Sequence, residues 1–219
     1  MKIKICGIRT FDEAMASVEA GADMLGFNFY PPSPRYITPG DCMRLVVRLE
    51  TALREHIGQV MLVGVFVNAP AKFVYAVFRD CHCDLIQLSG DEPPEMLNTL
   101  GARAYKALRP ESPAALAEAV TRSHRPTVTP AWLVDAYRPG QYGGTGQTAD
   151  WGLASQLAAH SPLLLAGGLR PDNVGEALRQ VNPWGVDVAS GVESSPGVKD
   201  IQKIQEFVRA VRAYNQEPA

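Results

Sequence analysis

Two reactive side chains stand at the ends of apolar runs that lie far apart in the chain. Cys6 closes the run over residues 2–6, and Asp135 closes the run over residues 131–135. A thiol and a carboxyl group can form a general acid–base pair, in which one group removes a proton while the other supplies one. This chemistry requires a fold that brings the ends of the two runs together.

The first run has the alternation of a β-strand with one polar face. On a strand, Lys4 and Cys6 project to one side, and Ile3 and Ile5 project to the other. A lysine one pleat below a thiol favours the thiolate, which is the reactive form of cysteine. An inward lysine also needs a counter-charge, and Asp187 in a late apolar run is the expected partner. The alternative is that Cys6 is only a small buried packing residue.

Two glycine-containing turns follow the last two apolar runs. Gly167 and Gly168 follow one of them, and Ser190 and Gly191 follow the other. Glycines let backbone N–H groups approach an anion closely, and a helix that begins there adds its positive end. These turns therefore predict a phosphate site, the alternative being two tight turns without a ligand.

Two loops are expected to complete a binding site. Prolines in residues 30–36 stiffen a loop that presents Arg35, whose guanidinium suits a carboxylate. The alternative for Arg35 is a solvated surface side chain. The glycine-rich segment 138–147 follows Asp135 and is long for such a connection, so it is interpreted as a lid. Taken alone, Asp135 can also be a helix or loop cap.

Composition narrows the class of protein. The chain has 219 residues, 46% hydrophobic content and a net charge of −2, which gives no reason to expect nucleic acid or an anionic membrane as a partner. No apolar run approaches the roughly 20 residues of a membrane span, and no signal peptide is indicated. We therefore expect a cytoplasmic protein whose four cysteines are free thiols. The spacing at residues 81–83 is poor for zinc, so a metal site is not expected there.

The whole chain alternates between strand-like and helix-like segments. Strands are expected near 3–7, 23–29, 60–67, 84–88, 103–108, 128–135, 162–167 and 185–190. Helices are expected near 11–21, 39–56, 70–80, 93–100, 112–123, 151–159, 171–181 and 199–214, with Asp12, Asp150 and Asp172 as caps or first-turn acids. Eight βα units without a linker predict a closed (β/α)₈ barrel forming a single domain over residues 1–219.

An open, doubly wound sheet is the main alternative to the barrel. That fold usually carries its glycine-rich phosphate loop in the first βα turn, whereas the glycines here concentrate late in the chain. In a barrel, the active site lies at the C-terminal ends of the strands. Cys6 and Asp135 would then close the first and sixth strands and share one mouth.

The segments taken together resemble the phosphoribosylanthranilate isomerase family. The resemblance covers nearly the whole chain and lies in KICG at 4–7, GFNF at 26–29, SPR at 33–35, GVFVN at 64–68, IQLSGDE at 86–92, LVD at 133–135, GGTG at 143–146, LAGGL at 165–169 and VDVASGVE at 186–193. Each motif is weak alone, but their order on successive strands is specific.

The resemblance implies a function and a role for each residue. The family carries out an Amadori rearrangement of N-(5-phosphoribosyl)anthranilate in tryptophan biosynthesis, without a cofactor. It implies that Cys6 is the base, that Asp135 is the acid and that Arg35 holds the anthranilate. The turns at Gly167, Gly168, Ser190 and Gly191 would hold the phosphate of a small-molecule substrate. The protein is expected to be a monomer or a homodimer.

Two positions depart from the family pattern. Ser89 stands where the family usually has histidine, and Ala149 stands where it usually has phenylalanine. The first change alters the polarity of the mouth, and the second removes a ring that would pack against the lid. Two other functions stay open, namely the histidine-pathway aminoaldose isomerase and a non-catalytic barrel that binds a phosphorylated ligand. The first uses a carboxylate where this chain has Cys6, and the second would lack the acid or the base.

Overall fold

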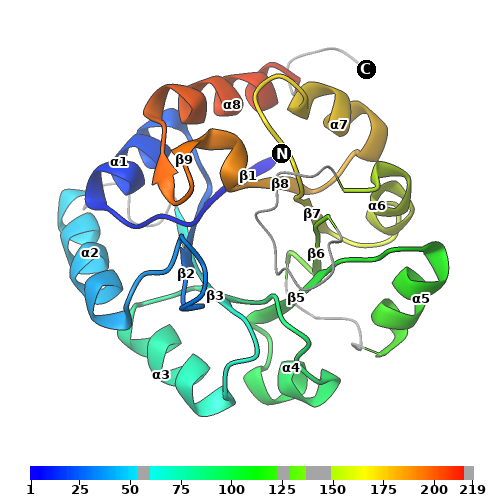
Figure 1. Ribbon diagram of the computed structural model, residues 1–219, viewed down its shortest axis with the longest axis horizontal. Helices are drawn as coiled ribbons and strands as arrows, with labels where there is room; N and C mark the ends of the chain where they lie inside the picture. The colour runs from blue at the N-terminus through cyan, green and yellow to red at the C-terminus, as the bar shows by residue number, and fades with distance from the viewer. Residues whose placement is uncertain (54–59, 123–128, 137–148, 215–219) are drawn as a thin grey trace.

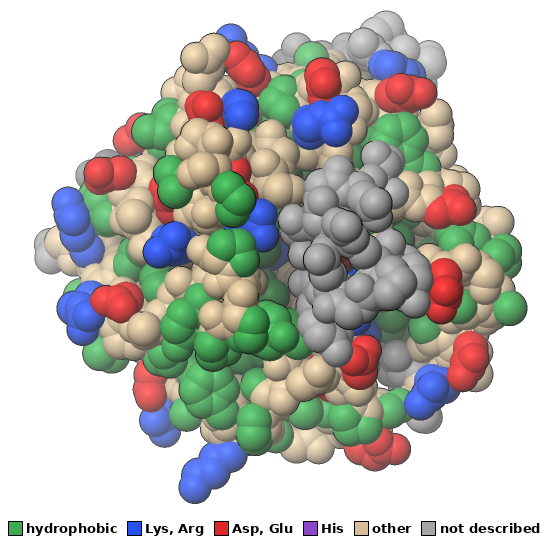
Figure 2. All heavy atoms as spheres, viewed as in Figure 1, with side chains coloured by type: hydrophobic (Ala, Val, Ile, Leu, Met, Phe, Trp, Pro, Cys, Tyr) green, Lys and Arg blue, Asp and Glu red, His purple; other side chains and the backbone are tan. Residues whose placement is uncertain are grey.

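The computed structural model describes residues 1–53, 60–122, 129–136 and 149–214. Eight parallel strands close into a barrel in the order β1 to β8, and β8 pairs with β1. The view along the barrel shows the helices as an outer ring (Figure 1). The predicted (β/α)₈ barrel is therefore confirmed. The same face drawn as spheres carries interspersed acidic and basic side chains (Figure 2).

The helices and strands alternate as the sequence predicts. The barrel strands are β1 Lys2–Cys6, β2 Met24–Asn28, β3 Met61–Phe66, β4 Leu85–Leu88, β5 Ala104–Leu108, β6 Trp132–Val134, β7 Leu163–Leu165 and β8 Gly185–Val188. The helices are α1 Phe11–Ala20, α2 Pro39–Ala52, α3 Ala71–Asp80, α4 Pro94–Leu100, α5 Pro113–Arg122, α6 Trp151–Ala158, α7 Val174–Val181 and α8 Ile201–Tyr214. Within the described residues, no helix has the length and apolar character needed to cross a membrane.

Two elements are shorter than expected. The prediction began the sixth strand at residue 128, which lies outside the described residues, but β6 starts only at Trp132. Pro130 has no N–H to donate to a strand ladder, which disfavours an earlier start. The helix predicted from 171 begins at Val174 because Asn173 closes a turn, with its Oδ1 accepting from the N–H of Arg170 at 2.8 Å.

The expected acidic caps are confirmed in part. Asp150 is the N-cap of α6 and accepts a hydrogen bond from the N–H of Leu153 at 3.0 Å. Asp12 lies in the first turn of α1, whose N-cap is Thr10. Asp172 is not a cap, because it precedes α7 and its side chain instead forms an ion pair with Arg170.

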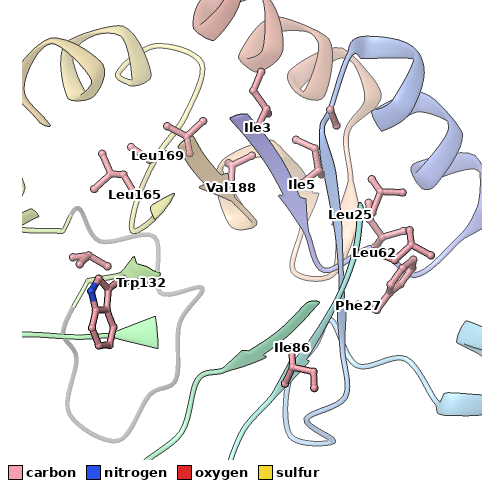
Figure 3. Packing of buried hydrophobic residues seen from close by; sticks show 14 of the residues in the cluster. Ile3, Ile5, Leu25, Phe27, Leu62, Ile86, Trp132, Leu165, Leu169 and Val188 are labelled. Atoms are coloured by element: carbon pink, nitrogen blue, oxygen red, sulfur yellow. The ribbon is translucent and has the colours of Figure 1, made fainter. Parts of the chain in front are cut away.

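The barrel strands bury both of their faces. Side chains such as Ile3, Ile5 and Phe27 point outward and pack under the helices (Figure 3). A smaller apolar cluster that includes Met24 and Leu133 fills the inside of the barrel. Most strand residues are therefore apolar, as expected for parallel strands covered by helices, and the polar exceptions such as Lys4, Gln87 and Asp187 point into the barrel.

A short hairpin after β8 was not predicted from the sequence. A 3₁₀ turn over Ser190–Val192 leads into β9 Glu193–Ser195, which pairs antiparallel with β10 Val198–Lys199. Figure 1 shows β9 beside β1 and α1. Gly197 has a φ of +82°, and a Cβ there would lie 2.2 Å from the carbonyl oxygen of Pro34. The glycine thus lets the hairpin pack directly against the loop that follows β2.

Candidate active site

The C-terminal ends of the strands surround one cavity. The predicted site residues that line it are Cys6, Arg35, Asp135, Gly167, Gly168, Asp187 and Ser190. Lys4 lies one pleat below Cys6 on β1, and Gly191 supports the turn that Ser190 begins. The fold therefore brings the expected acid, base and binding residues to one mouth. The segment interpreted as a lid, 138–147, lies outside the described residues.

Lys4 has the partner that the sequence predicts. Lys4 and Asp187 are register partners on β1 and β8, and their side chains form an ion pair with a Nζ–Oδ1 distance of 2.8 Å. Lys4 Nζ also donates to Oε1 of Gln87 at 3.0 Å across the barrel. Burial is the largest single influence and acts against the charge of Lys4, but the charge and hydrogen bond of Asp187 together with the other neighbouring groups outweigh it, so the pKa of Lys4 is raised. Lys4 therefore stays a buried cation.

The thiol of Cys6 lies in a space that a glycine on the next strand provides. A Cβ on Gly26 would lie 2.9 Å from Cys6 Sγ and 3.1 Å from Lys4 Nζ. Burial raises the pKa of Cys6, and the charge of Lys4 opposes this only in part. Lys4 therefore favours the thiolate as expected, but desolvation is the larger effect and leaves the pKa of the thiol above its ordinary value in the free protein.

Asp135 directly follows β6 and is held by its backbone. Its N–H donates to the carbonyl of Leu108 at 2.9 Å, and its Oδ1 accepts from the N–H of Ala136 at 2.8 Å. Burial raises the pKa of Asp135 to about 6, although the Ala136 hydrogen bond and the charge of Arg109 lower it. This carboxyl group therefore holds its proton up to a much higher pH than an ordinary aspartate.

Arg35 is buried and paired. Its Nε and Nη2 donate to the two carboxylate oxygens of Glu193 at 2.7 and 2.8 Å, and its side chain is only 9% exposed. The surface-arginine alternative is therefore wrong. Gly7 has a φ of +82°, and a Cβ there would lie 2.7 Å from Arg35 Cδ, so the glycine after Cys6 is what admits the Arg35 stem.

The two glycine turns pack against each other. Gly167 and Gly168 have φ values of +85° and +61°, which favour glycine. A Cβ on Gly191 would lie 1.8 Å from the carbonyl oxygen of Leu169, so the turn after β8 lies directly against the turn after β7. The backbone of both turns can therefore face the same small region of the mouth.

Sequence reasoning did not assign a site role to several polar residues of the cavity, among them Arg109 and Gln87. Arg109 directly follows β5, and its Nη1 donates to the carbonyl of Ser89 at 2.5 Å. Gln87 lies inside the barrel, donates to Ser89 Oγ at 2.9 Å and accepts from Tyr105 at 2.8 Å. The signal for Arg109 was its place after a predicted strand, as with Cys6 and Asp135. Ser89 thus belongs to a polar network inside the mouth.

A closed barrel with titratable side chains gathered at the C-terminal mouth has the layout of a (β/α)₈-barrel enzyme. Among the residues that the structure describes, no three His, Cys, Asp or Glu side chains are gathered as metal ligands. Residues 3–210 match the family model of N-(5'phosphoribosyl)anthranilate (PRA) isomerase. The chain belongs to this family, as its motifs predict.

Individual relatives match this chain over nearly its full length. The chain is 47% identical to N-(5'-phosphoribosyl)anthranilate isomerase of Roseiflexus sp. over 214 residues, which cover 97% of this chain and 98% of the relative. It is 43% identical to the Geobacter sulfurreducens protein of the same name, with coverage of 98% and 100%.

Solved structures share the fold. The phosphoribosyl anthranilate isomerase of Thermotoga maritima matches with a TM-score of 0.84 and 35% identity over 97% of this chain and 99% of that one. A second such structure is a complex with reduced 1-(o-carboxyphenylamino)-1-deoxyribulose 5-phosphate. It matches with a TM-score of 0.80 and 33% identity over the same shares of the two chains.

Proposed function

We propose that this chain isomerises N-(5'-phosphoribosyl)anthranilate to 1-(2-carboxyphenylamino)-1-deoxyribulose 5-phosphate, a step of tryptophan biosynthesis. The observation that carries the proposal is that Cys6 and Asp135 line one cavity in a chain of this family. The reaction is an aldose–ketose rearrangement of the Amadori type. It is an internal redox exchange, so it needs no external oxidant or reductant.

The proposed mechanism uses one proton donor and one acceptor. Asp135 donates its proton to the furanose ring oxygen as the bond from C1 to that oxygen breaks. The lone pair of the anthranilate nitrogen then forms the C1=N bond of a Schiff base. Cys6 removes the proton from C2, and the released electron pair forms C1=C2 while the iminium nitrogen is neutralised. The resulting enolamine tautomerises to the ketone product. The substrate's own nitrogen is the electron sink.

The pair is active when it holds a single proton, on Asp135 rather than on Cys6. Asp135 has a pKa of about 6 and burial raises that of Cys6, so a single proton shared by the pair lies mostly on Cys6. The active arrangement is therefore a small fraction of the enzyme, and this fraction is constant at pH values between the two pKa values. Below about pH 6 both groups are protonated, and above the pKa of Cys6 both protons are lost. A plateau of activity between these limits is consistent with the proposal.

The two ends of the substrate would be held separately. We assign the phosphate to the turns at Gly167, Gly168, Ser190 and Gly191, and the anthranilate to Arg35. We also expect a cytoplasmic enzyme that is a monomer or a homodimer. The mixture of charges on the face in Figure 2 supports a small-molecule substrate rather than nucleic acid.

The direct test follows the fluorescence of N-(5'-phosphoribosyl)anthranilate with the purified chain. Loss of substrate fluorescence with formation of the carboxyphenylamino ketose supports the proposal. Turnover of the imidazole-carboxamide aminoaldose of histidine biosynthesis, with no turnover of the anthranilate substrate, would instead identify the chain as the histidine-pathway aminoaldose isomerase. Binding of the anthranilate compound without turnover would identify a non-catalytic barrel.

Replacing Gly191 with alanine is expected to raise KM at least about tenfold with a smaller change in kcat. The added Cβ collides with the Leu169 carbonyl at 1.8 Å and forces the two turns apart. Inorganic phosphate should also become a weaker competitive inhibitor. The control is Gly175→Ala on α7, where the nearest atom to the new Cβ is a side-chain nitrogen at 3.8 Å. An unchanged KM in the Gly191 variant would remove these turns from phosphate binding.

A further inference from the structure

The carboxylate of Glu193 is the meeting point of two buried cations. Its Oε1 accepts from Arg35 Nε at 2.7 Å and from Lys199 Nζ at 3.0 Å, and its Oε2 accepts from Arg35 Nη2 at 2.8 Å. The side chains of Glu193 and Lys199 are 4% and 0% exposed. Burying three charged groups is costly unless each of them is paired and hydrogen-bonded. These contacts therefore hold the three side chains in fixed positions.

The pairing leaves one end of Arg35 open. Glu193 occupies the side of the guanidinium formed by Nε and Nη2, and among the described residues Nη1 has no hydrogen-bond partner. Arg35 lines the cavity, so its Nη1 end is the part that can meet a ligand. A guanidinium offers two parallel N–H groups at that end, which match the two oxygens of a carboxylate.

The same carboxylate is linked to the expected phosphate turn. Lys199 Nζ donates to the carbonyl of Ala189 at 2.9 Å, immediately before Ser190. Arg9 Nη1 further ties the hairpin to the loop after β2, since it donates to the carbonyls of Gly197 at 3.2 Å and Pro34 at 3.3 Å. The hairpin therefore joins the loop that carries Arg35 to the turn that begins at Ser190.

We infer that Glu193 is a positioning residue for substrate recognition, which aims the open end of Arg35 at the ortho-carboxylate of the aminobenzoate ring. The inference rests on the proposed function. Through Lys199, Glu193 also fixes the spacing between this carboxylate site and the phosphate turn. The enzyme's preference for an arylamine that bears a carboxylate would then depend on a residue that does not itself touch the substrate.

The test compares two substrates, N-(5-phosphoribosyl)anthranilate and N-(5-phosphoribosyl)aniline, which lacks the carboxylate. Glu193→Gln keeps the side-chain volume but presents an NH₂ group to one of the Arg35 donors. It should lower the ratio of kcat/KM for the two substrates at least about tenfold, through KM of the anthranilate compound. Arg35→Ala should give the same loss of selectivity, and the double variant should lose no more.

The matched control is Asp23→Asn. Asp23 also joins two cations, with Lys2 Nζ at 2.8 Å and Arg212 Nη2 at 2.9 Å, but it precedes β2 and so lies at the opposite end of the barrel. This variant should lower thermal stability and leave the selectivity ratio unchanged. If Glu193→Gln does not fold, Glu193→Asp keeps the charge with a shorter reach and should lose selectivity in the same direction.

The outcomes separate this inference from the proposed function. A selective wild type whose ratio is unaltered by the Glu193 variant overturns the positioning role alone. A loss of equal size on both substrates also overturns it, because that result indicates a general structural effect. A wild type that turns over neither substrate overturns the proposed function itself. Product formation is measured by chromatography, since the two arylamines differ in fluorescence.

Discussion

Replacing Cys6 with alanine is expected to lower kcat by about 10²–10⁴-fold, because the base that removes the C2 proton is lost. The fold should survive, since alanine keeps the Cβ and removes only the sulfur beside Gly26. Steady-state rates with N-(5'-phosphoribosyl)anthranilate, together with circular dichroism of the variant, measure both parts of the prediction. KM should change much less than kcat.

The control for this variant is another buried thiol. Cys42 lies on α2, is fully buried and does not line the cavity. Cys42→Ala removes a sulfur atom in the same way, so it should lower stability and leave kcat near the wild-type value. A Cys6→Ala variant that retains near-normal turnover would contradict the role of Cys6 as the base.

The first strand shows how much of the site the sequence could predict. The period of two along residues 3–6 places Lys4 and Cys6 on one face, and closure of the barrel places β8 beside β1. From these two facts the pairing of Lys4 with Asp187 follows, and the structure confirms it with a 2.8 Å ion pair. Local periodicity and a known closure rule were sufficient because both partners lie on regular strands.

The features that were missed depend on contacts between irregular segments. The pairing of Arg35 with Glu193 joins a loop after β2 to a hairpin after β8, and no periodic pattern marks either residue. The raised pKa of Cys6 was missed for a related reason. A neighbouring cation can be seen in the sequence, whereas the degree of burial depends on every strand that surrounds the thiol.

Asp135→Asn is expected to lower kcat by about 10²–10⁴-fold, because asparagine has no proton to give to the ring oxygen. The wild type should lose activity as the pH falls below about 6, the pKa of this carboxyl group, whereas the residual rate of the variant should rise with pH up to the pKa of Cys6 with no break near pH 6. The control is Asp150→Asn at the N-cap of α6, where asparagine caps equally well and the rate should be unchanged.

The same substitution should stabilise the fold at neutral pH. The pKa of Asp135 is raised from 3.8 to about 6 on folding, so the folded protein binds the proton more tightly than the unfolded chain. At a pH below the pKa of Asp135 in the unfolded chain, this group is protonated in both states and does not lower stability. At a pH above its pKa in the folded protein, its ionisation lowers the free energy of unfolding by about 1–3 kcal/mol. Asparagine carries no charge at any pH and avoids this cost, while its amide oxygen can still accept from the N–H of Ala136.

The two effects of Asp135→Asn together distinguish an acid from a structural cap. Thermal denaturation should show the variant to be more stable than the wild type at about pH 8, with the difference shrinking toward about pH 4.5. A carboxylate retained for packing or capping would instead lose stability on substitution, and kcat would change little. An inactive variant with a higher melting temperature is the result expected where a buried carboxyl group is kept for catalysis at a cost to the fold. A variant that is both less stable and fully active would contradict that role.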